Sequence, residues 1–99
     1  MATYTSTVDL IQRRLSMNFE RDNVGKCYLK MVEGNAKITI ILDEDCSRYD
    51  VTKVAVRFQH LISDKLDCNA IKVLPKTNYF IKDIDTFEVW NKQEGFTGL

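Results

Sequence analysis

The chain has 99 residues, of which 44% are hydrophobic and 28% charged, and its 14 basic and 14 acidic side chains cancel. This length suits one domain over residues 1–99, and the composition excludes general disorder. A protein that coats DNA or RNA usually carries a basic excess, which is missing here. Neutrality also removes long-range repulsion between copies. The charge balance therefore favours another protein, or a second copy of this chain, as the partner.

Cysteine content and hydropathy indicate the compartment. Cys27, Cys46 and Cys68 are too far apart in the sequence to form a zinc motif, and three thiols cannot all pair within one chain. The first residues lack the basic and apolar regions of a signal peptide, and no apolar run approaches the roughly 20 residues that span a bilayer. We therefore expect a cytoplasmic protein with free thiols, no membrane association, no metal and no cofactor.

The N-terminal third predicts a helix followed by a hairpin. A capping box formed by Ser6 and Asp9 begins the helix, which ends near Phe19 and presents one apolar face made of Val8, Ile11, Leu15 and Phe19. Asp9 and Arg13 are spaced for an ion pair. Residues 26–32 and 36–42 then alternate between apolar and polar, which is typical of half-buried strands. The glycine-containing connection at residues 33–35 predicts a hairpin.

Residues 47–66 predict a long amphipathic helix, begun by a second capping box at Ser47 and Asp50. Its apolar positions keep helical spacing, and they are Val51, Val54, Ala55, Phe58, Leu61, Ile62 and Leu66. We expect this stripe to be used fully by the sheet beneath it. The helix is therefore predicted to organise the core and not to form a binding groove.

The last third is less regular. Residues 70–74 predict a strand ended by Pro75, and residues 79–82 predict another. Residues 84–91 fit a strand or a helix, and residues 94–99 predict a short flexible tail. The expected fold is α+β, a small antiparallel sheet with helices packed on one face, in the order α-β-β-α-β and then β or α.

No catalytic constellation is recognisable. His60 is the only histidine, and its position beside the apolar stripe predicts a partly buried structural residue. Asp43, Glu44 and Asp45 precede the long helix, whose dipole favours them, although carboxylates at a strand end could also hold Mg²⁺. A small metal-dependent nuclease using Asp43, Asp45 and His60 is the third hypothesis, and we expect no catalytic residue.

The outer face of the hairpin combines basic and aromatic side chains. Lys26, Tyr28 and Lys30 share one side of their strand, and Lys37 is predicted to lie beside them. Such a surface can neutralise and stack on single-stranded nucleic acid. It also fits a solvated face whose lysines prevent edge-to-edge aggregation. Nucleic-acid binding through these four residues is the second hypothesis.

The first hypothesis is a non-enzymatic interaction module, an adaptor or inhibitor that occupies a partner's surface. Phe87, Trp90 and Phe96 lie in a polar C-terminal region, where exposed aromatics are favoured interface residues, although core packing is their alternative fate. Asp43, Glu44 and Asp45 complete the predicted partner-binding surface. Compact proteins of this kind are common among phage and mobile-element accessory proteins.

Overall fold

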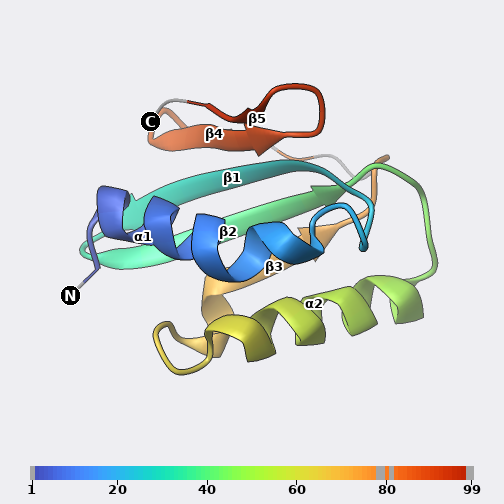
Figure 1. Ribbon diagram of the computed structural model, residues 1–99, viewed down its shortest axis with the longest axis horizontal. Helices are drawn as coiled ribbons and strands as arrows, with labels where there is room; N and C mark the ends of the chain where they lie inside the picture. The colour runs from blue at the N-terminus through green and yellow to red at the C-terminus, as the bar shows by residue number, and fades with distance from the viewer. Residues whose placement is uncertain (1, 78–79, 81, 98–99) are drawn as a thin grey trace.

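The helices and strands follow one another in the order α-β-β-α-β-β-β (Figure 1). The computed structural model describes residues 2–77, 80 and 82–97. Helix α1 (Tyr4–Leu10) continues into the π-helical η1 (Ile11–Leu15) and the 3₁₀-helical η2 (Ser16–Asn18). The remaining elements are β1 (Val24–Val32), β2 (Asn35–Leu42), α2 (Arg48–Ile62), η3 (Cys68–Ala70), β3 (Ile71–Leu74), β4 (Thr86–Asn91) and β5 (Gly95–Phe96).

The strands form one five-stranded sheet in the order β3-β2-β1-β4-β5. The α+β class is confirmed, but the prediction of a purely antiparallel sheet is wrong, because β3 pairs with β2 in parallel. The reason is the connection between these strands. A crossover helix returns the chain to the end at which the previous strand began, so the next strand runs in the same direction. All other pairs are antiparallel.

The predicted hairpin is confirmed. Strands β1 and β2 pair with Leu29 opposite Ile38 and Lys30 opposite Lys37. Their turn is Glu33–Gly34, with φ angles of 52° and 80°. Two positive φ angles in a two-residue loop are those of a type I′ turn, whose twist matches that of the strands. Gly34 has no Cβ, so it adopts this conformation without strain.

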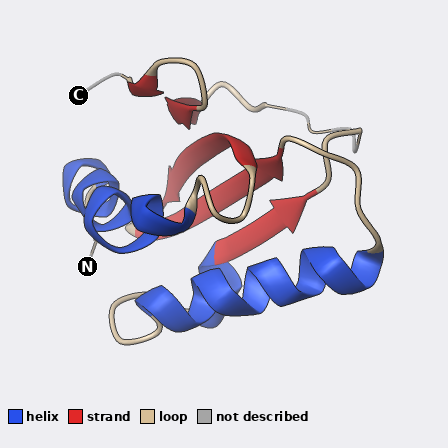
Figure 2. Ribbon diagram, turned by 45° about the vertical axis from the view of Figure 1, so that its right-hand side comes forward, coloured by secondary structure: helices blue, strands red, loops and turns tan. Residues whose placement is uncertain are grey.

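Both helices cover one face of the sheet (Figure 2). Val54, Phe58 and Ile62 of α2 are buried in the same cluster as Ile11 and Leu15 of the first helical run. The side chain of Ser47 begins α2, as predicted, by accepting a hydrogen bond from the backbone amide of Asp50. The helix ends at Ile62, four residues before the predicted end. There the chain turns, since the carbonyl of Ile62 accepts hydrogen bonds from the amides of both Lys65 and Leu66.

The predicted start of the first helix needs a correction. The capping residue is Thr3 and not Ser6. The Thr3 hydroxyl accepts a hydrogen bond from the amide of Ser6 at 3.1 Å, and the Ser6 hydroxyl accepts one from the amide of Thr3 at 3.0 Å. This reciprocal pair satisfies two amides that would lack partners at the helix start. The ion pair of Asp9 and Arg13 is confirmed at 3.1 Å.

The C-terminal region is strand and not helix. Residues 84–91, which fitted either structure, contain β4. Of the strand predicted at 79–82, Tyr79 and Ile81 lie outside the described residues, and Phe80 and Lys82 have no regular structure. The predicted flexible tail at 94–99 contains β5, with Phe96 paired to Trp90. Gly95 has a φ of 78°, so glycine lets the chain reverse there.

Removing the Phe58 side chain tests the predicted role of α2 in the core. Phe58 is fully buried and its ring centroid lies 5.9 Å from that of Phe19. Phe58→Ala should lower the free energy of unfolding by about 3–5 kcal/mol, because it leaves a cavity. Val56→Ala on the exposed side of α2 is the control and should change it by no more than about 0.5 kcal/mol. Urea denaturation measures both, and similar losses would contradict this packing.

Candidate functional site

The three C-terminal aromatic residues do not form one exposed surface. Trp90 and Phe96 pack against Phe19, with ring centroids 4.6 and 6.5 Å away. Phe87 is 53% exposed and meets the ring of Tyr4 edge-on at 5.9 Å. Core packing therefore accounts for Trp90 and Phe96, and only Phe87 of the three presents a large apolar surface to solvent.

The acidic turn before α2 binds other parts of this chain. Asp43 accepts a hydrogen bond from Lys92 at 2.9 Å and lies 4.0 Å from the ammonium of Lys76. Asp45 accepts one from the amide of Thr77, and the carbonyl of Glu44 accepts one from the amide of Lys76. Hydrogen bonding to Lys92 lowers the pKa of Asp43. These contacts connect the segments after β3 and β4 to the end of β2.

The outer face of the hairpin is partly covered. Tyr28 is only 6% exposed, because Phe80 packs on it with ring centroids 5.1 Å apart. Lys26 lies 3.8 Å from Glu88, and Lys30 forms an ion pair with Asp83 that raises the pKa of Lys30. Lys37 is exposed. A base could therefore stack on Tyr28 only after displacing the segment that follows β3.

Groups that carry out acid–base, thiol or metal chemistry are not assembled in the described part of the chain. No three of its His, Cys, Asp and Glu residues lie close enough together to hold a metal ion. Burial raises the pKa of Cys27, and burial with nearby carboxylates raises that of Cys46, so both thiols resist ionisation. His60 is exposed on the outer side of α2. The prediction of partial burial is wrong, since the helix buries the side chains at 54, 58 and 62 and His60 points away from them.

A groove runs along this outer side of α2. It has a volume of about 530 Å³, and η2 and the turn after it form its second wall through Asn18 and Arg21. Tyr49 and Val56 are 71% and 57% exposed. We call this site the α2 groove; its residues on the helix are Tyr49, Thr52, Lys53, Val56, Arg57, His60 and Leu61.

Sequence analysis missed the α2 groove, although a signal for it existed. Positions 49, 53, 56 and 60 follow the spacing i, i+4, i+7, i+11, which places them on one side of a helix. Tyr49 and Val56 are the two large apolar residues at these otherwise polar positions, outside the buried stripe. The structure thus adds to the predicted buried stripe of α2 a groove on its outer side, which the prediction did not include.

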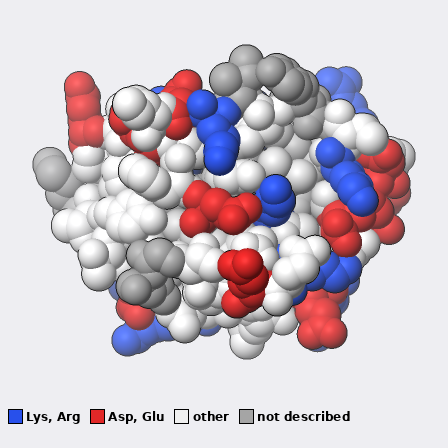
Figure 3. Space-filling model, turned by 90° about the horizontal axis from the view of Figure 1, so that it is seen from above, with Lys and Arg blue, Asp and Glu red and all other residues white. Residues whose placement is uncertain are grey.

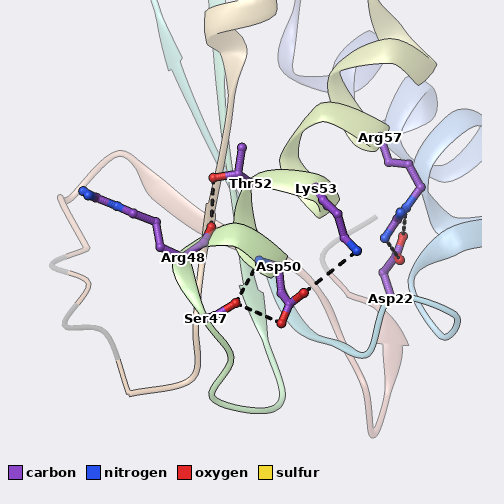
Figure 4. A network of polar contacts seen from close by, with 7 residues as sticks. All are labelled: Asp22, Ser47, Arg48, Asp50, Thr52, Lys53 and Arg57. Carbon is purple, nitrogen blue, oxygen red and sulfur yellow. Dashed lines mark hydrogen bonds and ion pairs between the residues drawn. The ribbon is translucent and has the colours of Figure 1, made fainter.

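The side chains around the α2 groove are basic. Arg57 contacts Asp22 at 2.6 Å, and the ammonium of Lys53 lies 4.0 Å from Asp50 (Figure 4). The same ammonium lies 5.0 Å from the centre of the Tyr49 ring. The Asp22 side chain is only 5% exposed, so this ion pair connects α2 to the turn before β1. No carboxylate is among the described side chains that line the groove. The described lining therefore carries three basic side chains, two of which pair with the carboxylates of Asp22 and Asp50 beside the groove.

The surface over β4 and β5 carries both signs of charge. Figure 3 views the molecule from the side on which β4 and β5 lie in Figure 1, and there acidic and basic side chains are interspersed with uncharged surface. The described ion pairs of this region include Lys92 with Asp43 and Lys26 with Glu88. The α2 groove differs from this mixed surface because its described lining combines apolar side chains with basic ones and includes no carboxylate.

The fold and the groove define a small α+β protein with a mixed five-stranded sheet and a cationic, apolar groove on a helix. No helix in the described residues is long and apolar enough to pass through a bilayer. Comparison with protein-family models, curated proteins and solved structures found no match to this chain.

The pKa of Asp43 leads to a pH-dependent prediction. Since Lys92 lowers this pKa, the carboxylate stabilises the fold above the ordinary carboxyl pKa of about 4. The contribution is lost as the pH falls through the lower value of the folded state. Asp43→Asn should therefore lower Tm at neutral pH, and its effect should diminish as the pH falls through the folded-state pKa of Asp43.

Thermal unfolding followed by circular dichroism at several pH values measures this effect. Glu44→Gln is the matched control, because its carboxylate makes no hydrogen bond or ion pair with a described residue. It should leave Tm nearly unchanged at every pH. An equal loss of Tm for Asp43→Asn at low and neutral pH would show that its carboxylate charge is not what matters.

Proposed function

We propose that this protein is a non-enzymatic interaction module that binds an acidic, partly apolar segment of a partner protein in the α2 groove. By covering that segment it acts as an adaptor or inhibitor. The observation that supports this proposal best is the exposure of Tyr49 and Val56 between basic side chains on a helix whose opposite side is buried. Large exposed apolar side chains within a concave surface are typical of binding sites.

The apolar part of the groove would supply most of the affinity. Val56 lies between Tyr49 and His60 along the helix, so an apolar side chain of the partner placed there loses water on several sides. Central, desolvated contacts of this kind dominate binding energies. A stable interface covers about 800 Å² on each partner. The contact would therefore extend beyond the lining, for example onto Met17, which precedes Asn18 in the chain and is 71% exposed.

The charges would select the partner. Arg21 makes no ion pair with a described residue, and Lys53 has only a long one to Asp50. Both can accept a partner's carboxylates without breaking a close contact within the fold. Arg57 is occupied by Asp22, so its main role is to support the wall of the groove. Complementary charge of this sort raises the association rate and makes binding sensitive to salt.

Site-specific photocrosslinking tests the proposal. A photoreactive benzoylphenylalanine at position 56 should form a covalent adduct with a partner in lysate of the cells that naturally make the protein. The same residue at position 32, where Val32 is 38% exposed on the hairpin, is the control. The adduct should form at 56 and not at 32, and mass spectrometry should place it in an acidic segment. A partner captured equally at both positions, or no adduct at 56, contradicts the proposal.

Substitutions then measure the two contributions to binding of the identified partner. Val56→Asp should cost at least about 2 kcal/mol, a loss of roughly 30-fold in Kd by calorimetry. Lys53→Glu should slow association and flatten its salt dependence. Lys37→Glu, an equal change of charge on the hairpin, should do neither. Binding that survives both groove substitutions would place the interface elsewhere.

A further inference from the structure

A second concave site lies on the opposite side of the sheet, where β1 meets the segment after β3 and the turn between β4 and β5. It has a volume of about 370 Å³. We call it the lysine pocket. Its charged members are Lys26, Lys76, Lys82, Lys92 and Asp43, and Phe80 with Ile41 supplies apolar wall. Four ammonium groups against one carboxylate leave an excess of three positive charges.

The fold holds these lysines in place. The amide of Lys92 donates to the carbonyl of Gly25 at 3.0 Å, and the amide of Lys76 donates to that of Glu44 at 3.2 Å. Asp43 binds the ammonium of Lys92 at 2.9 Å and lies 4.0 Å from that of Lys76, so it brings two cations together. Lys82 lies over the Tyr28 ring, 5.6 Å from its centre. Backbone hydrogen bonds and the carboxylate of Asp43 therefore hold these cations close together.

We propose that the lysine pocket binds a nucleoside polyphosphate, with its phosphates at Lys26, Lys76 and Lys92 and its base against Phe80. The volume is within the roughly 300–1,000 Å³ of small-ligand sites. Clustered ammonium groups recognise phosphate as point charges, and an aromatic ring provides a stacking surface for a base. This proposal is independent of the α2 groove.

The surroundings favour a mononucleotide over a nucleic-acid strand. A nucleic-acid strand that followed β1 beyond the pocket would meet the ion pair of Lys30 and Asp83. The negative charge of Asp85 also contributes to raising the pKa of Lys30. Along the same face of β1, Phe80 packs on the ring of Tyr28, so a base of that strand could not stack on Tyr28. These carboxylates would repel a second run of phosphates. The hairpin face predicted to bind nucleic acid is thus interrupted, and Lys26 is left at the edge of a compact pocket.

Calorimetry and NMR with defined probes test the proposal. The probes are ATP, GTP, inorganic tripolyphosphate, adenosine and an oligothymidylate of eight nucleotides. ATP or GTP should bind more tightly than tripolyphosphate and adenosine, and should shift the amide signals of Gly25, Lys26 and Asp43. Failure of both nucleotides to bind, tripolyphosphate binding as tightly as either, or oligothymidylate binding more tightly per site overturns it.

Paired substitutions separate the pocket from general electrostatics. Lys26→Gln with Lys76→Gln should weaken nucleotide binding about tenfold or more, since each lysine lost removes a charged contact to phosphate. Lys37→Gln with Lys65→Gln removes the same charge from exposed positions elsewhere and should weaken it by less than about twofold. Equal losses in the two pairs would overturn the assignment. If the first pair did not fold, the amide shifts of the unsubstituted protein would still decide it.

Discussion

The aromatic cluster around Phe19 determines how the parts of this protein fit together. Phe19 is 1% exposed, and its ring meets those of Phe58, Trp90 and Phe96. One side chain thus joins the end of the first helical run to α2, β4 and β5. Buried aromatic rings contribute more apolar area than other residues, so this contact sets the position of α2 against the turn after η2. That position creates the α2 groove, whose second wall includes Arg21.

The two faces of the sheet are stabilised by different forces. On one face, apolar side chains of both helices exclude water, and this contribution changes little with pH or salt. On the other, the described residues after β3 are attached by charged contacts, including Lys30 with Asp83 and Lys76 with Asp43. Such partly exposed ion pairs are weaker and are screened by salt. The lysine pocket therefore lies on the more easily altered face.

Local patterns predicted most of the fold. Alternating apolar and polar residues predicted the hairpin, helical spacing predicted α2, and the capping residue Ser47 predicted where α2 begins. Each of these patterns depends only on residues that are close in sequence. The direction of β3 and the partial burial of Trp90 depend on contacts between distant residues, which no local pattern contains. The candidate sites follow the same division. The sequence spacing of Tyr49 and Val56 predicts that they share one side of a helix. No sequence pattern predicts that Lys26, Lys76 and Lys92, which come from three separate segments, lie together.

The zero net charge of the chain argued against anionic partners. That argument is weaker once the positions of the charged side chains are known. Carboxylates such as Asp22, Asp43 and Asp83 are engaged in ion pairs that connect separate segments of the chain. No carboxylate of the described residues lines the α2 groove, and Asp43 alone lines the lysine pocket. A bound group senses charges within a Debye length of about 8 Å, which is well below the 34 Å extent of the molecule. That range includes the carboxylates of Asp22, Asp50 and Glu88, which lie 2.6, 4.0 and 3.8 Å from cations of the two sites. The local arrangement of charge at each proposed site, and not the total charge of the chain, therefore sets the electrostatic field that a bound group would meet.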